Sequence, residues 1–362
     1  MVLKNRYKYC PQMKEYDKLS KVWLPYLMYF NQPNYSSSII NTDSRGFRCV
    51  TNKSNQMIYD FNNPEKKEKC LFVGNSTALG IGSSNDENTI PSIMNRNSEY
   101  LWYNFSGRLY SSTQELLLFL LYGPLLKNIK KVIIFSGVNN LSIYYLSKNY
   151  IKELGSFIHS SNYNNKMNSG EISTNRKILK FFLQPLYGNK IDYSNIRRDD
   201  LFKSLFNNKN TKNKNETNSL YSNIQNTHKT KEDLLFVLKR DIEHWKNMSN
   251  IFQFELIYAL QPYSNWIDKT LSPEEKELFS EIDQAPGELW NVLNNKINTD
   301  KHQWISSNLS IICENLDIKF IDINKEILNY SFNNKWLFID RIHITDEANS
   351  IMAKIFEDNK LL

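Results

Sequence analysis

The sequence is poor in the features that mark secreted, disulfide-linked or membrane-spanning proteins. Its 362 residues include only four cysteines, at positions 10, 49, 70 and 313, and none of them forms a CxxC pair. We therefore expect neither a disulfide framework nor a structural zinc site. The longest apolar run, 116–126, is interrupted by a Gly-Pro pair and is too short to span a bilayer. Because the first 19 residues lack the apolar segment of a secretory signal, we expect a cytoplasmic protein.

Charge of one sign is only modestly in excess. The formal net charge is +7, with 23% charged and 41% hydrophobic residues, so the chain has enough apolar material for a packed core. The basic residues are scattered, and their densest run, 209–214, lies in a polar stretch of low complexity. We therefore expect no nucleic-acid partner. The composition does not indicate an oligomeric state.

Short apolar runs alternate with amphipathic segments along most of the chain. The runs predict strands at 70–74, 99–105, 131–136, 254–260 and 319–323. The segments between and after them predict helices at 111–122, 233–247, 272–282, 303–315 and 345–356. Strands that alternate with helices are typical of a parallel sheet covered by helices on both faces. The sequence therefore predicts an α/β protein with a three-layer α/β/α sandwich and about five parallel strands.

Two regions do not follow this alternation. Residues 1–65 are rich in Tyr and Asn and predict an irregular N-terminal extension that packs on the core. Residues 66–362 then form the main domain, interrupted by a polar insertion at about 160–231. The stretch 207–219 within this insertion is nearly free of apolar residues, as in flexible segments.

Polar residues with catalytic chemistry follow several predicted strands, where an open parallel sheet binds its ligands. Ser76 comes directly after the first strand, and an Asp-x-x-His sequence, Asp340 to His343, precedes the last helix. His343 would take the proton of the Ser76 hydroxyl, while Asp340 would orient and stabilise the imidazole. Taken alone, Ser76 is better explained as a helix cap. His343 taken alone also fits an ordinary surface histidine.

The same strand ends offer donors for an oxyanion. These are the backbone N–H of Ser76, the backbone N–H of Gly107 and the side-chain amide of Asn139. Gly107 and Asn139 also suit ordinary turns. Two further residues are candidate substrate contacts. Gln261 either lines the pocket or merely ends a strand before Pro262. Arg48 either binds an anionic part of a substrate or pairs with an internal carboxylate, and we favour the internal pair.

The order of these residues resembles that of the SGNH (GDSL-type) hydrolases. GNST (74–77), NFSG (104–107), GVNN (137–140) and DRIH (340–343) are similar to the four blocks of that family. SRGFR (44–48), LQP (260–262) and FIDRIHITDEAN (338–349) resemble a bacterial subgroup. The resemblance implies a flavodoxin-like SGNH fold and assigns Ser76, Asp340 and His343 as catalytic residues. Asn75 and Asn140 depart from it, since the family usually has Asp at both positions.

The resemblance implies a serine esterase that hydrolyses an O-acyl group, with O-acetyl expected, through an acyl-Ser76 intermediate. A small molecule, a carbohydrate or a surface-glycan precursor would carry the ester. An O-acyltransferase with a sugar hydroxyl as acceptor would use the same site. The third hypothesis is a non-catalytic binding module on the same fold. None of these chemistries requires a metal ion or a cofactor.

Overall fold

The computed structural model describes residues 4–59, 68–147, 150–151, 153–158, 163, 229–284 and 288–362. The chain separates into two compact units, one of Met1–Ile158 with Lys229–Leu362 and the other of His159–His228. The predicted insertion at about 160–231 lies almost entirely outside the described residues. The first unit contains every predicted strand and helix.

The centre of the first unit is one parallel sheet of five strands. The strands are β5 (Lys69–Gly74), β6 (Leu101–Ser106), β7 (Ile129–Ser136), β8 (Glu255–Leu260) and β9 (Lys319–Asp322). They lie in the order β6-β5-β7-β8-β9, and every neighbouring pair is parallel. Numbered along the chain this is 2-1-3-4-5, the flavodoxin-like order. The predicted α/β sandwich with about five parallel strands is confirmed.

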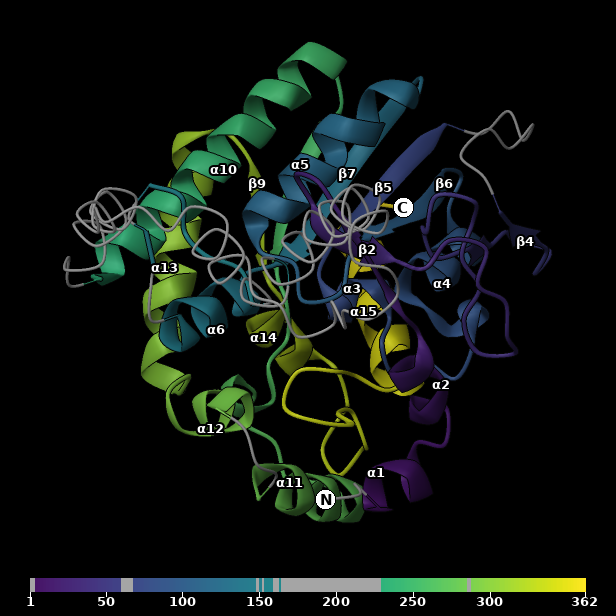
Figure 1. The fold of residues 1–362 in the computed structure, drawn as a ribbon, viewed down its shortest axis with the longest axis vertical. Coiled ribbons are helices and arrows are strands. Elements are labelled where there is room, and N and C mark those ends of the chain that lie inside the picture. Colours follow the sequence, from purple (N-terminus) through teal and green to yellow (C-terminus); the bar gives the residue numbers. More distant parts are fainter. Residues whose placement is uncertain are drawn as a thin grey trace, which may run out of the picture. The chain divides into compact units, whose positions relative to one another are not determined.

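Helices cover both faces of this sheet. After β5, the helices of this unit are α3 (Ser76–Leu79), α4 (Ile90–Asn97), α5 (Ser112–Tyr122), α6 (Val138–Leu146), α10 (Lys231–Phe252), α11 (Pro273–Asp283), α12 (Glu288–Asn295), α13 (Thr299–Asn315), α14 (Ile323–Glu326) and α15 (Asp346–Asp358). Short 3-10 turns are η1 (Asp86–Asn88), η2 (Gly123–Leu125), η5 (Ser264–Trp266) and η6 (Ile327–Asn329). Figure 1 shows α10 between α5 and α13, which it contacts. Helices α4 and α15 contact each other.

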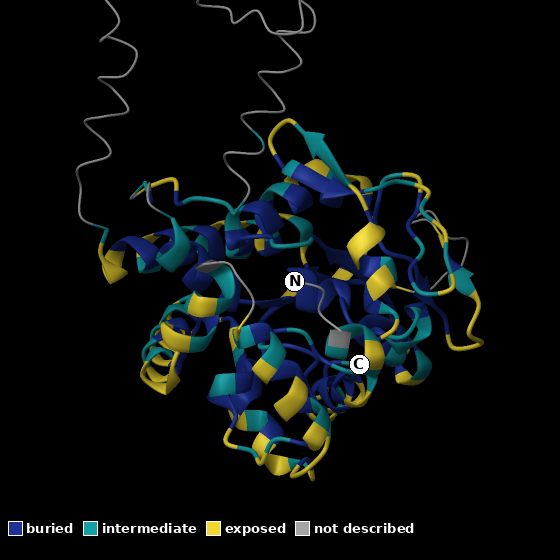
Figure 2. Cartoon of the chain, turned by 60° about the horizontal axis from the view of Figure 1, so that its bottom comes forward, coloured by how far each residue is buried: buried dark blue, intermediate teal, exposed yellow. Residues whose placement is uncertain are grey.

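Alternate residues along each strand pack against opposite layers. Leu71 and Val73 of β5 belong to the same hydrophobic cluster as the apolar faces of α5, α10 and α13. Cys70 and Phe72 belong to the cluster that contains the apolar faces of α4 and α15. The strands are therefore buried on both faces, which explains their unbroken apolar sequences. Figure 2 shows the buried centre in dark blue and the exposed outer turns of the helices in yellow.

The helix ends follow the local sequence closely. Ser111 caps α5 and forms a capping box with Gln114. Ser272 caps α11 in the same way, with Pro273 as its first residue. Among the described residues, no helix is both long and apolar enough to cross a bilayer.

The expectation that residues 1–65 are irregular is wrong. This region contains α1 (Lys4–Tyr9), α2 (Met13–Lys18), the hairpin β1 (Lys21–Leu24) and β2 (Met28–Asn31), and the pair β3 (Val50–Thr51) and β4 (Met57–Ile58). Each element is too short to produce a recognisable period in the sequence. Packing stabilises them instead, since Met13 and Tyr16 are fully buried in the cluster of α4 and α15.

Candidate active site

Ser76 is the first residue of α3 and lies immediately beyond the carboxyl end of β5. Asn75 caps this short helix by accepting a hydrogen bond from the backbone N–H of Thr77. The turn requires glycine at position 74, because a Cβ there would lie 2.3 Å from the carbonyl oxygen of Phe135. This tight strand-to-helix turn holds Ser76 at the edge of the sheet, with 4% of its surface exposed.

The structure brings Ser76 together with His343 and Asp340, as the order of the motifs predicts. His343 Nε2 lies 2.9 Å from Ser76 Oγ, and His343 Nδ1 lies 2.7 Å from Asp340 Oδ2. The second carboxylate oxygen, Asp340 Oδ1, accepts the backbone N–H groups of Ile342 and His343. With its proton on Nδ1, the imidazole can accept the hydroxyl proton of Ser76 at Nε2. The geometry therefore suits a nucleophile, a base and an orienting carboxylate.

Asp340 is held ionised beside His343. Its complete burial by itself raises the pKa of the carboxyl, but the charge and hydrogen bond of His343 act in the opposite direction. The backbone N–H donors of Ile342 and His343 add to this stabilisation. The net result is a pKa for Asp340 below its ordinary value.

A second cluster of Ser, His and Asp lies at the end of β9. His302 Nε2 is 2.8 Å from Asp322 Oδ2, and the Ser306 hydroxyl donates to the same oxygen. The serine therefore contacts the carboxylate rather than the imidazole, so His302 is not placed to receive its proton. The ring of Trp266 stacks on His302, and the cluster serves to anchor this part of the fold.

Gly107 does not supply the expected oxyanion donor. Its backbone N–H donates to the carbonyl of Gly74 and continues the ladder between β5 and β6. A Cβ at this position would lie 2.3 Å from the ring of Tyr110. Glycine is therefore required by the packing of Tyr110, and the N–H is occupied within the sheet.

The side chain of Asn139 is buried near the start of α6 and is held by the backbone. Its Nδ2 donates to the carbonyl oxygen of Tyr110 at 2.9 Å. Tyr110 is fixed in turn because its hydroxyl donates to the carbonyl of Tyr29 in β2. The hydrogen bond from Asn139 to Tyr110 uses one of the two N–H groups of the Asn139 amide. The N-terminal hairpin thus orients the Asn139 amide through Tyr110, a role that the sequence did not indicate.

Gln261 and Arg48 are not placed to touch a substrate. Gln261 has no exposed surface, and its side chain binds Asn75 and Thr77. Arg48 pairs with Asp86, at 2.7 Å between Nε and Oδ1, and both side chains are buried. The favoured internal pair of Arg48 is confirmed, and its alternative role as a substrate contact is wrong. The substrate contact expected of Gln261 is also wrong, because internal partners occupy its side-chain atoms.

A buried acid lies behind the turn that carries Asn139. Glu115 of α5 accepts a hydrogen bond from Ser136, the last residue of β7. Its other oxygen, Oε2, has no hydrogen-bond partner among the described residues. Burial raises the pKa of Glu115 to about 8, with the charge of Asp241 adding to the effect against the Ser136 hydrogen bond.

This pKa predicts that Glu115 makes folding depend on pH. In the folded chain, Glu115 keeps its proton at pH values above the ordinary pKa of a glutamate. The contribution of the protonated Glu115 to stability is therefore complete at low pH and is lost as the pH rises towards 8. The loss amounts to about 1.4 kcal/mol per pH unit. We expect Glu115→Gln to gain in Tm relative to the wild type as the pH rises from about 5 to 8. Thermal unfolding across this range checks the expectation, and parallel curves for the two proteins contradict it.

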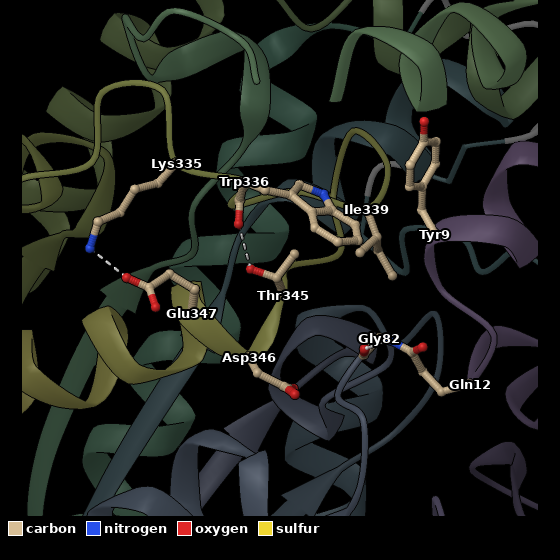
Figure 3. A pocket seen from close by; sticks show the side chains of 9 residues that line it. All are labelled: Tyr9, Gln12, Gly82, Lys335, Trp336, Ile339, Thr345, Asp346 and Glu347. Carbon is tan, nitrogen blue, oxygen red and sulfur yellow. Dashed lines mark hydrogen bonds and ion pairs between the residues drawn. The ribbon is translucent and has the colours of Figure 1, made fainter. Parts of the chain in front are cut away.

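An open cleft is lined in part by the segment 335–347, which contains Asp340 (Figure 3). Its volume is about 530 Å³, and its lining residues are Tyr9, Gln12, Gly82, Lys335, Trp336, Ile339, Thr345, Asp346 and Glu347. The rings of Tyr9 and Trp336 meet edge to face in its wall. Neither Ser76 nor His343 lines this cleft, so we do not assign it to the reacting part of a substrate.

Comparison with known proteins leaves the family open. No family model and no curated protein sequence matches the chain. Among solved structures, it is similar to a protein described as an acylhydrolase from Bacteroides fragilis NCTC 9343 (12% identity, TM-score 0.41), covering 82% of this chain and 90% of that one. It is also similar to the acetyl xylan esterase AlAXEase (12% identity, TM-score 0.37), covering 80% of this chain and 98% of that one. A third similar structure is a GDSL-like lipase from Bacteroides thetaiotaomicron VPI-5482 (13% identity, TM-score 0.37), covering 82% of this chain and 91% of that one. At such low identities and TM-scores, we base no functional statement on these likenesses.

Proposed function

We propose that this chain is a serine-dependent ester hydrolase of the SGNH type. The observation that carries the proposal is the contact of Ser76 Oγ with His343 Nε2 at 2.9 Å, with His343 Nδ1 on the buried carboxylate of Asp340. Three residues from two distant segments form a connected nucleophile, base and orienting group. The ordered SGNH motifs in the sequence point to the same three residues.

In the proposed reaction, Ser76 Oγ attacks the ester carbonyl while its proton passes to His343 Nε2. The bond to the alcohol then breaks, and the alkoxide takes the proton from His343. Water, deprotonated by His343 in the same way, hydrolyses the acyl-Ser76 ester and restores the free hydroxyl. The backbone N–H of Ser76 and the side-chain amide of Asn139 stabilise the oxyanion in both steps. No step in this scheme passes through a metal ion or a cofactor.

The acyl group that this site favours is small. Ser76 is 4% exposed, and Asn139 is 1% exposed, which leaves a long acyl chain little open surface at the nucleophile. We propose an O-acetyl ester as the first substrate to test. A carbohydrate is our proposal for the alcohol, and it rests on the sequence resemblance described above.

Labelling with a fluorophosphonate tests the nucleophile directly. The probe forms a bond to an activated serine oxygen with loss of fluoride, so we expect one adduct per chain, on the peptide that contains Ser76. Mass spectrometry of the digested protein locates it. Ser306 is the internal control, because its hydroxyl also lies in a buried Ser, His and Asp cluster but donates to the carboxylate of Asp322.

The proposal requires the label on Ser76 and hydrolysis of p-nitrophenyl acetate by the same preparation. A label on Ser306, or hydrolysis without any label on Ser76, would show that another residue is the nucleophile. A folded protein that neither hydrolyses the ester nor takes up the probe would favour a binding module on this fold.

A further inference from the structure

A chain of side-chain hydrogen bonds runs beneath the turn that carries Ser76. It begins at Asn75, whose Oδ1 accepts the backbone N–H of Thr77 at 3.0 Å. A backbone N–H cannot reverse its role, so the oxygen of the Asn75 amide must face it. The Nδ2 group of Asn75 then points the other way and donates to Gln261 Oε1. The orientation of one amide is thereby fixed by the backbone.

The same logic fixes the direction of the next two bonds. Because Gln261 Oε1 accepts from Asn75, its Nε2 group must donate, and it does so to Thr77 Oγ1 at 3.2 Å. The Thr77 hydroxyl is then free to donate its own proton, and the carbonyl oxygen of Ile342 lies 3.4 Å away. None of the three side chains has exposed surface, so water does not compete for these bonds.

The two ends of this chain flank the two reacting groups. Asn75 and Thr77 are the neighbours of Ser76, and Ile342 precedes His343. The main chain of Gln261 is itself anchored, because its N–H donates to the carbonyl of Ser136 and its carbonyl accepts from Asn324 Nδ2. The end of β8 thus provides a fixed point for both the nucleophile turn and the histidine segment.

We propose that Gln261 is a positioning residue that, through Asn75 and Thr77, sets the distance between Ser76 Oγ and His343 Nε2. This inference rests on the proposed function, since it assumes that the distance limits the reaction. Gln261 acts at one remove, because its side-chain hydrogen bonds go to the neighbours of Ser76 and reach the histidine segment only through Thr77.

The proposal explains why position 75 is Asn in this chain. A carboxylate at this position would still accept the N–H of Thr77, but it has no proton to donate to Gln261. The Gln261 amide would have to turn over to donate to it, and its oxygen would then face Thr77. The Thr77 hydroxyl would donate to Gln261 and release the carbonyl of Ile342. Replacing the amide nitrogen of Asn75 by oxygen would therefore reverse the two side-chain hydrogen bonds of Gln261 and remove the one to Ile342.

The test compares Thr77→Val with Thr77→Ser. Valine has nearly the shape of threonine but lacks the hydroxyl, whereas serine keeps the hydroxyl and loses the methyl group. We expect the rate constant for fluorophosphonate labelling of Ser76 to fall about 10- to 100-fold in Thr77→Val and to stay near the wild-type value in Thr77→Ser. The kcat for p-nitrophenyl acetate should fall with it, while KM should stay constant because the chain does not touch substrate.

Circular dichroism and thermal unfolding establish that each variant is folded. A purely structural role would lower Tm in both variants and leave the labelling rate of the folded protein unchanged, which would overturn the inference. If Thr77→Val does not fold, Asn75→Asp serves instead and should show the same loss of labelling rate. An Asn75→Asp variant that is labelled as fast as the wild type would contradict the inference. If the folded wild type is not labelled at Ser76 at all, the proposed function fails and this inference fails with it.

Discussion

Asp340→Asn is expected to lower kcat about 10⁴-fold while the protein stays folded. The reason lies in the two oxygens of the carboxylate. Oδ1 accepts two backbone N–H groups, from Ile342 and His343, and Oδ2 faces His343 Nδ1. An amide at this position must keep its oxygen on the backbone donors, so its NH₂ group faces Nδ1. The imidazole then carries its proton on Nε2, and a protonated Nε2 cannot accept the proton of Ser76. Steady-state hydrolysis of p-nitrophenyl acetate measures the effect.

The second buried Asp–His pair supplies a matched control. Asp322→Asn makes the same chemical change beside His302, where the nearby serine, Ser306, donates to the carboxylate instead of contacting the imidazole. We expect this variant to lose stability but to keep kcat within about threefold. A similar loss of kcat in both variants would mean that the effect of Asp340→Asn comes from the fold rather than from the proton position.

Arg48→Met is expected to destabilise the protein by about 3–5 kcal/mol, because it leaves the carboxylate of Asp86 buried without its partner. Arg48 Nε binds Asp86, and its NH1 group donates to the carbonyls of Leu79 and Gly80 at the end of α3. The substitution therefore removes one ion pair and two bonds to the segment that follows the nucleophile. Chemical denaturation followed by circular dichroism gives the free energy of unfolding.

Two further variants show whether the buried charge is the cause. Lys354→Met removes an exposed lysine of α15 that pairs with Glu357 and Asp358, and it should leave the free energy of unfolding close to the wild-type value. Adding Asp86→Asn to Arg48→Met should recover part of the loss, since the amide carries no charge. A double variant that is less stable than Arg48→Met would refute this explanation.

Much of the candidate site was predictable because of how a parallel sheet is built. Ser76 and His343 are 267 residues apart in the chain. Both follow from simple patterns, a polar turn after an apolar run and an Asp-x-x-His sequence before a helix. The carboxyl ends of parallel strands share one edge, which is where the turn after β5 places Ser76. His343 reaches the same edge from the segment between η6 and α15.

Several elements that escaped prediction lack a recognisable period in the sequence. Helix α6 is almost wholly buried from Val138 to Tyr144, so it lacks the polar face that reveals a surface helix. The N-terminal helices and hairpin have only four to six residues each. Such short elements are stable only through the core on which they pack, and that core comes from distant parts of the sequence.

The sequence by itself determined the class of fold, the five strands and the three residues that meet as a possible catalytic group. Tertiary structure decided which polar groups remain available to a substrate. The N–H of Gly107 is used by Gly74, Gln261 is used by Asn75 and Thr77, and Arg48 is used by Asp86. A residue type states what a side chain can bind, but its partner is set by chain segments that only folding brings within hydrogen-bonding distance.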